Sequence, residues 1–379
     1  ATQSLANLPA GDYTVAGAPI RVPGDRVDTV FDATVTGSPA HVGDGGTANV
    51  SVTYGQRPGT GKLWVANWSS RVVFGFDSTQ IATAGTVSSA ASSVLIVPNL
   101  GTASPASPSI AFAPDGAAWV GYCKGGAVPE YVTRIPPSQL NVQGAVTSDV
   151  TITLPSGTAQ APDLTYECVG GLAFDSAGNL WVATNTDGIK EDHLLRFDAA
   201  DLKASGAPTP AVTLTSSSFS EITDIAFDAA GNLFAGSYGK PLVARVSAAQ
   251  LTASNSALVP DVLLTMPSGT GVGGMTLDAG GGLWVTDYNG NRAMQFLSAD
   301  IGASGTPTPK VIITGIPGAE QLAFDQLGNL WVAAFNTNKV LSYAAADLTT
   351  SGAKTPVTTL TANAALKSPY GIRFNPGTH

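Results

Sequence analysis

The chain has 379 residues, of which only 12% are charged, and its formal net charge is -9. An acidic chain without a basic stripe has nothing to neutralise phosphates, so neither nucleic acid nor an anionic membrane surface is expected as a partner. The 44% of hydrophobic residues, six Trp among them, exclude a disordered chain. No apolar run reaches the roughly 18 residues that a membrane span needs.

The N-terminal part of the chain lies outside any repeat. Its first residues, Ala1-Thr-Gln-Ser, resemble the start of a mature secreted protein whose signal peptide has been removed, and the low Lys content agrees. We therefore expect a secreted or periplasmic protein. Residues 1–56 contain strand-like pieces and a glycine-rich turn. We expect this N-terminal extension to cap one face of the following domain or to extend an edge of it, with a divergent additional repeat unit as the alternative.

From residue 57 onward the chain repeats one pattern. The apolar core Leu-Trp-Val, or a variant of it, recurs around residues 64, 119, 181, 234, 284 and 331, at intervals of 47 to 62 residues. Intervals of this length suit four strands per unit, and each unit buries its apolar faces only against its neighbours. The repeat predicts an all-β fold, a six-bladed β-propeller of four-stranded antiparallel blades over residues 57–379.

Each unit contains a hairpin with the pattern Phe-Asp-x-x-Gly-Asn-Leu-Trp-Val. The Asp is expected to accept hydrogen bonds from backbone amides of the turn, the Gly to supply a positive φ, and the Trp to pack between blades. A calcium site in the turn is the alternative, although the ligand spacing of an EF-hand is missing. The turn residues are Asp175 and Gly178, Asp228 and Gly231, Asp278 and Gly281, and Asp325 and Gly328.

The connection to the fourth strand also repeats. One helical turn, anchored by a single Leu or Ile, is followed by Gly and Pro and then by an outer strand. The anchoring residues are Ile81, Leu140, Leu202, Leu251, Ile301 and Leu348.

The two ends of the repeat region complement each other. Residues 370–377 match a first strand that no second strand follows, and residues 61–67 match a second strand that no first strand precedes. Joining them makes one complete blade and removes the open sheet edges. We therefore expect the C-terminal strand to close the ring by joining the first blade.

The unit Phe-Asp-x-x-Gly-Asn-Leu-Trp-Val-Ala resembles the repeats of the NHL, SMP-30/gluconolactonase and virginiamycin B lyase-like six-bladed propellers. These groups include metal-dependent lactonases, a lyase and many binding modules, and the resemblance implies that any chemistry lies at one mouth of the central channel. In lactonase-type members the metal ligands tend to stand five residues before the turn Asp. The corresponding residues here are Pro108, Gly170, Thr223, Gly273, Glu320 and Tyr370.

Of these positions only Glu320 supplies a candidate metal ligand, and a divalent cation such as calcium is the cofactor that the resemblance implies. A divalent site needs several converging oxygen ligands, so the missing ones argue against lactonase chemistry. The lyase-like group implies a His near its metal, but His41, His193 and His379 lie in no matching loop. No catalytic residue is therefore assigned.

Further polar residues belong to loops at the same mouth. Glu167, Glu221 and Asp224 lie before or at the start of first strands, while Asn185 and Asp287 end second strands. Together with Glu320 they are the candidate ligand-binding residues, because converging carboxylates raise one another's pKa or recruit a cation. The alternative is that they are solvated loop residues.

The two cysteines are placed for a disulfide. Cys123 follows a second strand and Cys168 precedes the next first strand, so both are expected on one face of adjacent blades. In an oxidising compartment we expect them to be bonded, which would stabilise the fold by roughly 4 kcal/mol on the chain-entropy model.

Three functions agree with these patterns. The first is a secreted binding or assembly module for a protein or small polar ligand, because catalytic ligands are missing. The second is a metal-dependent hydrolase or lyase at the channel mouth, with Glu320, Glu221, Asp224 and Asp287 as ligands or bases. The third is a structural subunit of an extracellular assembly or homo-oligomer, in which residues 1–56 dock onto a neighbour.

Overall fold

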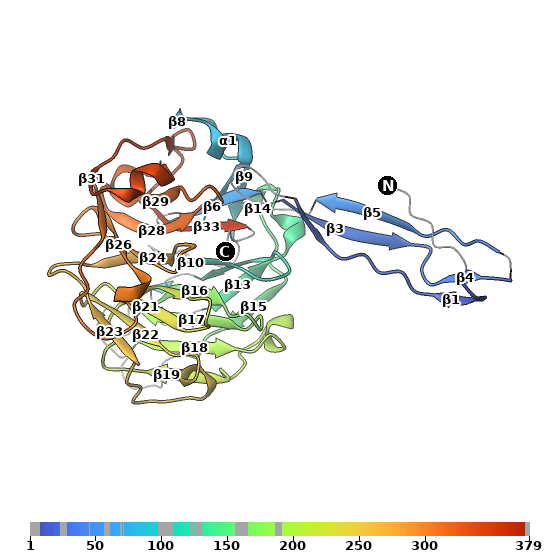
Figure 1. Cartoon of the computed structure of the whole chain (residues 1–379), viewed down its shortest axis with the longest axis horizontal. Coiled ribbons are helices and arrows are strands. Elements are labelled where there is room, and N and C mark those ends of the chain that lie inside the picture. Colours follow the sequence, from blue (N-terminus) through green and yellow to red (C-terminus); the bar gives the residue numbers. More distant parts are fainter. Residues whose placement is uncertain are drawn as a thin grey trace.

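The computed structural model describes residues 8–22, 29–44, 46–56, 61–68, 70, 72–97, 109–121, 124–125, 131–155, 166–185 and 192–375, with the backbone alone at 21, 22, 29, 55, 56, 124, 125, 166 and 167. These residues form a nearly all-β structure with two parts, a propeller and an N-terminal arm (Figure 1). Within the described residues, no helix is both long enough and apolar enough to cross a membrane.

The propeller consists of six antiparallel blades, as the repeat predicted. In the first three blades the strands, from the axis outward, are β33 (Pro369–Asn375), β6 (Lys62–Asn67), β7 (Val72–Asp77) and β9 (Ser93–Ile96); β10 (Ser109–Phe112), β11 (Ala118–Gly121), β13 (Tyr131–Ile135) and β15 (Val150–Thr153); and β16 (Tyr166–Phe174), β17 (Leu180–Asn185), β18 (His193–Phe197) and β19 (Val212–Thr215).

The other three blades repeat this order. Their strands are β20 (Ile222–Phe227), β21 (Leu233–Ser237), β22 (Leu242–Val246) and β23 (Val262–Thr265); β24 (Val272–Leu277), β25 (Leu283–Asp287), β26 (Arg292–Phe296) and β27 (Val311–Thr314); and β28 (Ala319–Phe324), β29 (Leu330–Ala334), β30 (Lys339–Tyr343) and β32 (Thr358–Leu360). The short strand β12 (Lys124–Gly125) pairs with the start of β16.

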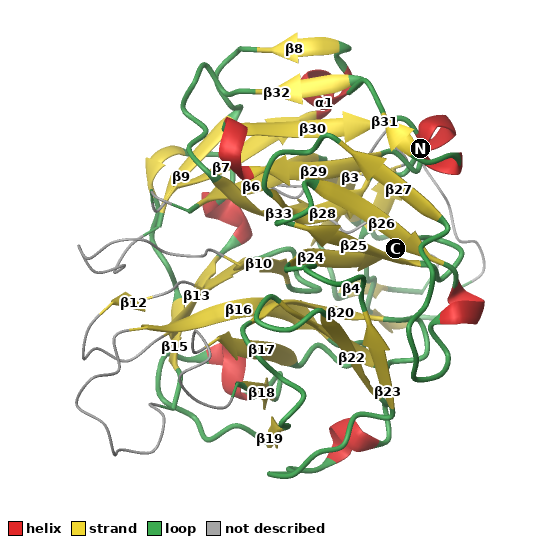
Figure 2. Ribbon diagram, turned by 90° about the vertical axis from the view of Figure 1, so that its left-hand side faces the viewer, coloured by secondary structure: helices red, strands yellow, loops and turns green. Residues whose placement is uncertain are grey.

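The ring is closed by the two ends of the repeat region. Strand β33 pairs antiparallel with β6, so the last described strand completes the first blade. The six inner strands β33, β10, β16, β20, β24 and β28 then follow one another around the axis, and β33 contacts both β28 and β10 (Figure 2). The predicted closure is confirmed, and the inner strands are left without an open edge.

The outer edge of each blade is tied to the next blade. After each helical turn the chain runs parallel to the outer strand of the preceding blade, either as a short strand, β8 (Gly85–Val87), β14 (Gln143–Ala145) or β31 (Gly352–Ala353), or as a single bridge at Gly206, Asn255 or Gly305. The preceding Ser often adds a side-chain hydrogen bond, as where Ser304 Oγ accepts from Leu263 N at 2.9 Å. The sequence did not predict this outer belt.

The helical turns themselves lie where the sequence placed them. They are α1 (Ser78–Ala82), η1 (Pro137–Gln139), η2 (Asp201–Lys203), η3 (Gln250–Thr252), η4 (Ser298–Asp300) and η6 (Ala345–Thr349), and a further one, η5 (Phe335–Thr337), follows β29. All six anchoring Leu and Ile residues are buried, which explains why an apolar residue recurs at this point of each connection.

The repeated Asp, Gly and Asn hold the hairpin turns. In the third blade Asp175 Oδ1 accepts hydrogen bonds from the amides of Ala177 at 3.0 Å and Asn179 at 2.9 Å, and Gly178 has a φ of 80°. Asp175 Oδ2 also accepts from the indole of Trp181 at 3.2 Å, a contact that recurs in the fifth and sixth blades. The turn carboxylates are therefore occupied by structural hydrogen bonds, as predicted.

The Trp residues pack between blades. Trp181 meets Phe227 of the next blade at a ring-centroid distance of 6.2 Å, and Trp64, Trp119, Trp284 and Trp331 make the same contact with Phe112, Phe174, Phe324 and Phe374. The apolar core accordingly divides into six clusters, each shared by two adjacent blades. A blade alone could not bury these side chains.

The N-terminal arm forms two small sheets of its own. Strand β1 (Gly11–Tyr13) pairs with β4 (Ala40–Val42), and β3 (Thr29–Thr36) lies between β2 (Ile20–Val22) and β5 (Ser51–Gln56). In the described part neither sheet shares a strand with a blade, so residues 1–56 add no seventh blade there. Figure 1 shows the arm extending away from the propeller, with β1 and β4 far from the ring.

Ring closure leads to a testable expectation. Deleting residues 369–379 removes β33, opens the ring and exposes the core that this strand covers, in a fold whose net stability is only roughly 5–15 kcal/mol. We expect the cooperative thermal transition, followed by circular dichroism, to disappear. Deleting residues 1–56 is the matched control and should leave the transition temperature of the propeller unchanged. A truncated chain that still melts cooperatively would show that closure is dispensable.

Candidate functional site

Five of the six inner strands carry a β-bulge near one end of the channel. The strand register shifts at Gly170, Thr223, Gly273–Gly274, Glu320–Gln321 and Tyr370. These include every described position that stands five residues before the turn Asp or its equivalent Asn375. A bulge turns an extra residue out of the ladder, which explains why this position supplies functional side chains in the families that the repeat resembles.

Most residues at the bulges are small because the inner strands approach one another closely. A Cβ atom at Gly274 would lie 2.6 Å from Cα of Gln321 on the next strand, and one at Gly171 would lie 2.7 Å from the amide of Ile225. Close inner strands therefore favour small residues, and a large or polar side chain there is an exception. The exceptions include Glu320, Gln321, Asp224 and Arg373.

An ion pair crosses the channel. Arg373 Nη2 lies 2.7 Å from Asp224 Oδ1, although β33 and β20 are on opposite sides of the ring. The amides of Met275 and Ile225 also donate to this carboxyl, at 3.1 and 3.0 Å. Burial raises the pKa of Asp224, while Arg373 and these amides oppose that rise. In the other blades the residue equivalent to Arg373 is Ala or Thr, so only the first blade can supply this cation to Asp224.

Glu320 is a buried carboxyl without a partner. Only 7% of the residue is exposed, and none of the described residues donates a hydrogen bond or forms an ion pair with its carboxyl. Burial, and then the charge of Asp224, raise the pKa of Glu320 well above 4.5. Its neighbour Gln321 accepts from Arg373 Nη1 at 3.2 Å, but the buried Nε2 atom of Gln321 has no partner in the described part of the chain. A fully buried side-chain atom without a partner is rare in proteins, so this nitrogen of Gln321 calls for an explanation.

Beside Glu320 lies an arc of aromatic side chains, which we call the aromatic arc. Its ring-centroid contacts run from Tyr238 to Tyr288 (6.0 Å), from Tyr288 to Phe335 (6.0 Å), from Phe335 to Trp68 (5.8 Å) and from Trp68 to Tyr370 (5.3 Å). These residues come from four consecutive blades. Burial raises the pKa of Tyr238 and Tyr288, and the nearby charge of Glu320 raises both further. The carboxyl and the arc therefore share one site.

Asparagine side chains brace the aromatic arc. The hydroxyl of Tyr238 donates to Asn289 Oδ1 at 3.4 Å, and the hydroxyl of Tyr288 donates to Asn336 Oδ1 at 3.3 Å, each Asn belonging to the next blade. Tyr238 is 38% exposed, whereas Trp68, Tyr288 and Phe335 are half-buried. The arc thus presents a solvent-accessible wall with fixed ring positions.

The arc was not predicted from the sequence, although the sequence contains a signal for it. Four of its five members, Trp68, Tyr238, Tyr288 and Phe335, stand four residues after the core Trp or Phe of their repeat. Cys123 and Asn185 occupy the same position in the other two units. An aromatic residue in four of six units at a fixed offset indicates a shared surface once the ring geometry is known.

The other predicted ligand residues differ in their surroundings. Asp287 is 1% exposed and accepts from Arg292 Nε at 2.9 Å and from the amide of Gly290 at 2.9 Å, so it holds a turn. Asn185 Nδ2 donates to the carbonyl of Ile222 at 3.2 Å and ties two blades together. Glu221 has a left-handed φ of 52°, lies half-buried and contributes to the field at Tyr238. Of the predicted set, Glu320 and Glu221 are near the arc.

Two predictions concern parts of the chain that the structure does not describe. The backbone of Glu167 lies in β16, but its side chain is outside the described part, so its role as a ligand stays a prediction. Cys123 is also outside the described residues, so its disulfide with the buried Cys168 stays a prediction. The pairing of Lys124 with Glu167 supports it, because these residues adjoin the two cysteines.

A resident metal ion finds few ligands here. Within the described residues, no group of three or more His, Cys, Asp or Glu side chains is close enough to hold one. Glu320 stands beside aromatic rings rather than the several oxygen ligands that calcium prefers. The divalent cation implied by the resemblance therefore does not fit the residues that surround Glu320.

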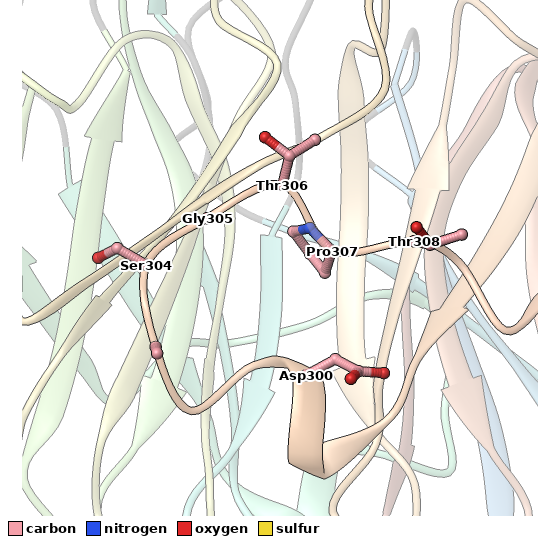
Figure 3. A pocket seen from close by; sticks show the side chains of 7 residues that line it. Asp300, Ser304, Gly305, Thr306, Pro307 and Thr308 are labelled. Carbon is pink, nitrogen blue, oxygen red and sulfur yellow. The ribbon is translucent and has the colours of Figure 1, made fainter.

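A shallow depression elsewhere on the surface offers no comparable chemistry. It lies where η4 and the segment after it curl against the neighbouring blade (Figure 3). Ser304 and Gly305 in its wall already bond to β23, so the depression accompanies the outer belt. The residues that line it are Asp300, Ala303, Ser304, Gly305, Thr306, Pro307 and Thr308.

Comparisons with known proteins agree with the fold. No family model and no curated protein matches the chain. A protein of unknown function from Bacteroides caccae matches with a TM-score of 0.51 and 11% identity, covering 82% of this chain and 97% of that one. At such low identity the likeness shows the fold alone.

Two further structural neighbours are six-bladed propeller enzymes. A catalytically inactive virginiamycin B lyase from Staphylococcus aureus, solved with quinupristin, has a TM-score of 0.41 and 14% identity and covers 86% of this chain and 84% of its own. The PQQ-bound aldose sugar dehydrogenase from Streptomyces coelicolor has a TM-score of 0.47 and 14% identity, covering 72% and 84%.

The pKa of Glu320 predicts a pH-dependent stability difference. Below pH 4.5 the carboxyl is protonated in both folded and unfolded chains, so Glu320→Gln should unfold with nearly the wild-type free energy. As the pH rises from there to the folded pKa, only the unfolded chain ionises, and the wild type loses about 1.4 kcal/mol for each unit by which the pKa is raised. Denaturant unfolding at several pH values should therefore show Glu320→Gln to be the more stable protein at neutral pH.

The control for this measurement is Asp201→Asn, on the exposed surface of η2. It should follow the wild-type profile at every pH. A Glu320→Gln protein that is less stable than the wild type at neutral pH would mean that Glu320 is ionised and paired in the folded state.

Proposed function

We propose that this protein is a binding module that holds a small polar organic ligand at the channel mouth, between Glu320 and the aromatic arc. The observation that carries the proposal is the carboxyl of Glu320, a residue that is 7% exposed, pairs with no residue that the structure describes and lies next to half-buried aromatic rings. The fully buried side-chain atoms without a partner in the described residues are Asn67 Oδ1 and Gln321 Nε2, so the oxygens of Glu320 keep some access to solvent. A ligand at the mouth can therefore reach this carboxyl, pair with it and bury the exposed ring faces.

The geometry favours binding over metal-dependent hydrolysis or lyase chemistry. Asp224, one of the proposed bases, is paired with Arg373 across the channel, and Asp287 is held by Arg292. The acidic residues that remain as candidate metal ligands are Glu320 and the nearby Glu221, which are fewer than a divalent metal site needs. We also propose that the protein is secreted or periplasmic, which its composition and the expected disulfide between Cys123 and Cys168 support.

The aromatic arc provides a direct test of this proposal. A thermal-shift screen of small polar organic compounds, followed by titration of each hit, should identify ligands whose affinity falls about tenfold in Phe335→Ala, because the lost ring supplies much of the contact area. Trp68 is the half-buried Trp of the arc, so intrinsic fluorescence should report binding.

Leu327→Ala serves as the matched control. Leu327 is 57% exposed and lies in the hairpin turn between β28 and β29, at the opposite end of the blade from Phe335. Its substitution should leave every affinity unchanged. Ligands that bind Phe335→Ala as tightly as the wild type would place the binding site elsewhere.

A second candidate function, self-association, is favoured by the N-terminal arm. Ile20, Val52 and Tyr54 are 42%, 37% and 44% exposed, while Val30 and Ala40 are its buried apolar side chains. Strands β2 and β5 are the edges of their sheet, and a small sheet with so little core is only marginally stable alone. Pairing of β5 with β5 of a second copy would cover Val52 and Tyr54 on both chains.

The molar mass in solution tests this second candidate. Light scattering should give a dimer or larger species for the full chain, and a monomer both after deletion of residues 1–56 and for Val52→Lys, which places a charge on the exposed edge strand. A monomeric full chain at high concentration would exclude assembly through the arm.

A further inference from the structure

The groups near Glu320 are acidic residues and aromatic rings. The charge of Asp224 acts on Glu320. The charges of Tyr288, Glu320 and Glu221 act on Tyr238, and the charge of Glu320 acts on Tyr288. Arg373 offers no compensation, because its guanidinium donates to Asp224, to Gln321 and to the carbonyl of Ile372. None of the lysines and arginines that the structure describes forms an ion pair with Glu320. A ligand that enters this site meets a carboxyl without a counter-ion.

The walls of the site suit a cation that carries little bound water. Rings of Trp, Tyr and Phe attract ammonium groups through their negative faces. In the aromatic arc, Tyr238 and Tyr288 are close enough to Glu320 for its charge to act on them, and the other rings continue from Tyr288. A metal ion would lack oxygen ligands, as described above, and an anion would bring a further negative charge next to the acidic residues Glu320, Glu221 and Asp224. A neutral sugar could stack on the rings but would leave Glu320 without a charged partner.

We infer that the ligand of the channel mouth is an organic cation of the ammonium type, whose charged group lies between the carboxyl of Glu320 and the rings of the aromatic arc. This inference rests on the proposed function and narrows the class of ligand. Binding of the cation lowers the raised pKa of Glu320, because an adjacent positive charge favours the carboxylate over the acid, and the proton that the acid form carries goes to solvent. The bound state is then a contact pair of one carboxylate and one ammonium, shielded by aromatic rings.

A pair of isosteric probes tests the inference. Choline and its neutral carbon analogue 3,3-dimethylbutan-1-ol have nearly the same shape, so their affinities for the full-length protein differ only through charge. Titration calorimetry should show choline binding at least about tenfold more tightly than the alcohol. In Glu320→Gln this preference should disappear, while Asp201→Asn should retain it. Calorimetry in buffers of different ionisation enthalpy should show proton release on choline binding to the wild type alone.

The possible results separate this inference from the proposed function. Equal affinities for choline and the alcohol, both weakened by Phe335→Ala, would overturn the cation assignment and leave the binding site in place. Tighter binding of choline that survives Glu320→Gln would also overturn it, because the counter-ion would then be another group. If neither probe binds and no compound in the screen responds to Phe335→Ala, both the inference and the proposed function fail.

Discussion

The convergence of six inner strands on one axis constrains the rest of this structure. Strands that approach so closely leave room for little beyond Gly and Ala, as the 2.6 Å between a Cβ at Gly274 and Gln321 Cα illustrates. The apolar side chains must therefore point between the blades, where each Trp meets a Phe of the next repeat. Such a ring is stable only when closed, and the pairing of β33 with β6 supplies the closure.

The same constraint identifies the functional residues, because any large or polar side chain near the axis departs from what packing favours. Arg373 replaces a small residue of the repeat and pairs with the buried Asp224 on the far side of the channel, so the ion pair spans the channel. Burying such a pair is seldom a net gain in stability. Glu320 is a greater departure, since this acidic residue is only 7% exposed and no residue in the described part of the chain bonds to its carboxyl. Proteins usually retain such groups where they meet a ligand.

The sequence was sufficient to predict the blades, the turns and the closure, because each depends on contacts that recur with the repeat. Glu320 could be singled out in the same way, as the one acidic residue at its repeat position. The ion pair between Asp224 and Arg373 could not, because the two residues lie 149 positions apart and meet only across the closed ring. The aromatic arc also needed the ring geometry, which brings residues of separate repeats into contact. The arm follows no repeat, so nothing in its sequence fixed its direction.

The proposed site depends on whether Glu320 lacks a partner and has a raised pKa in the folded protein. Its pKa can be measured directly by following the side-chain carboxyl carbon in ¹³C NMR spectra across a pH titration, with Glu320→Gln to assign the signal. We expect a midpoint well above 4.5 in the free protein and a shift to lower pH when a ligand occupies the mouth. A midpoint at or below 4.5 would mean that the carboxyl is solvated or already paired, and would contradict the proposed site.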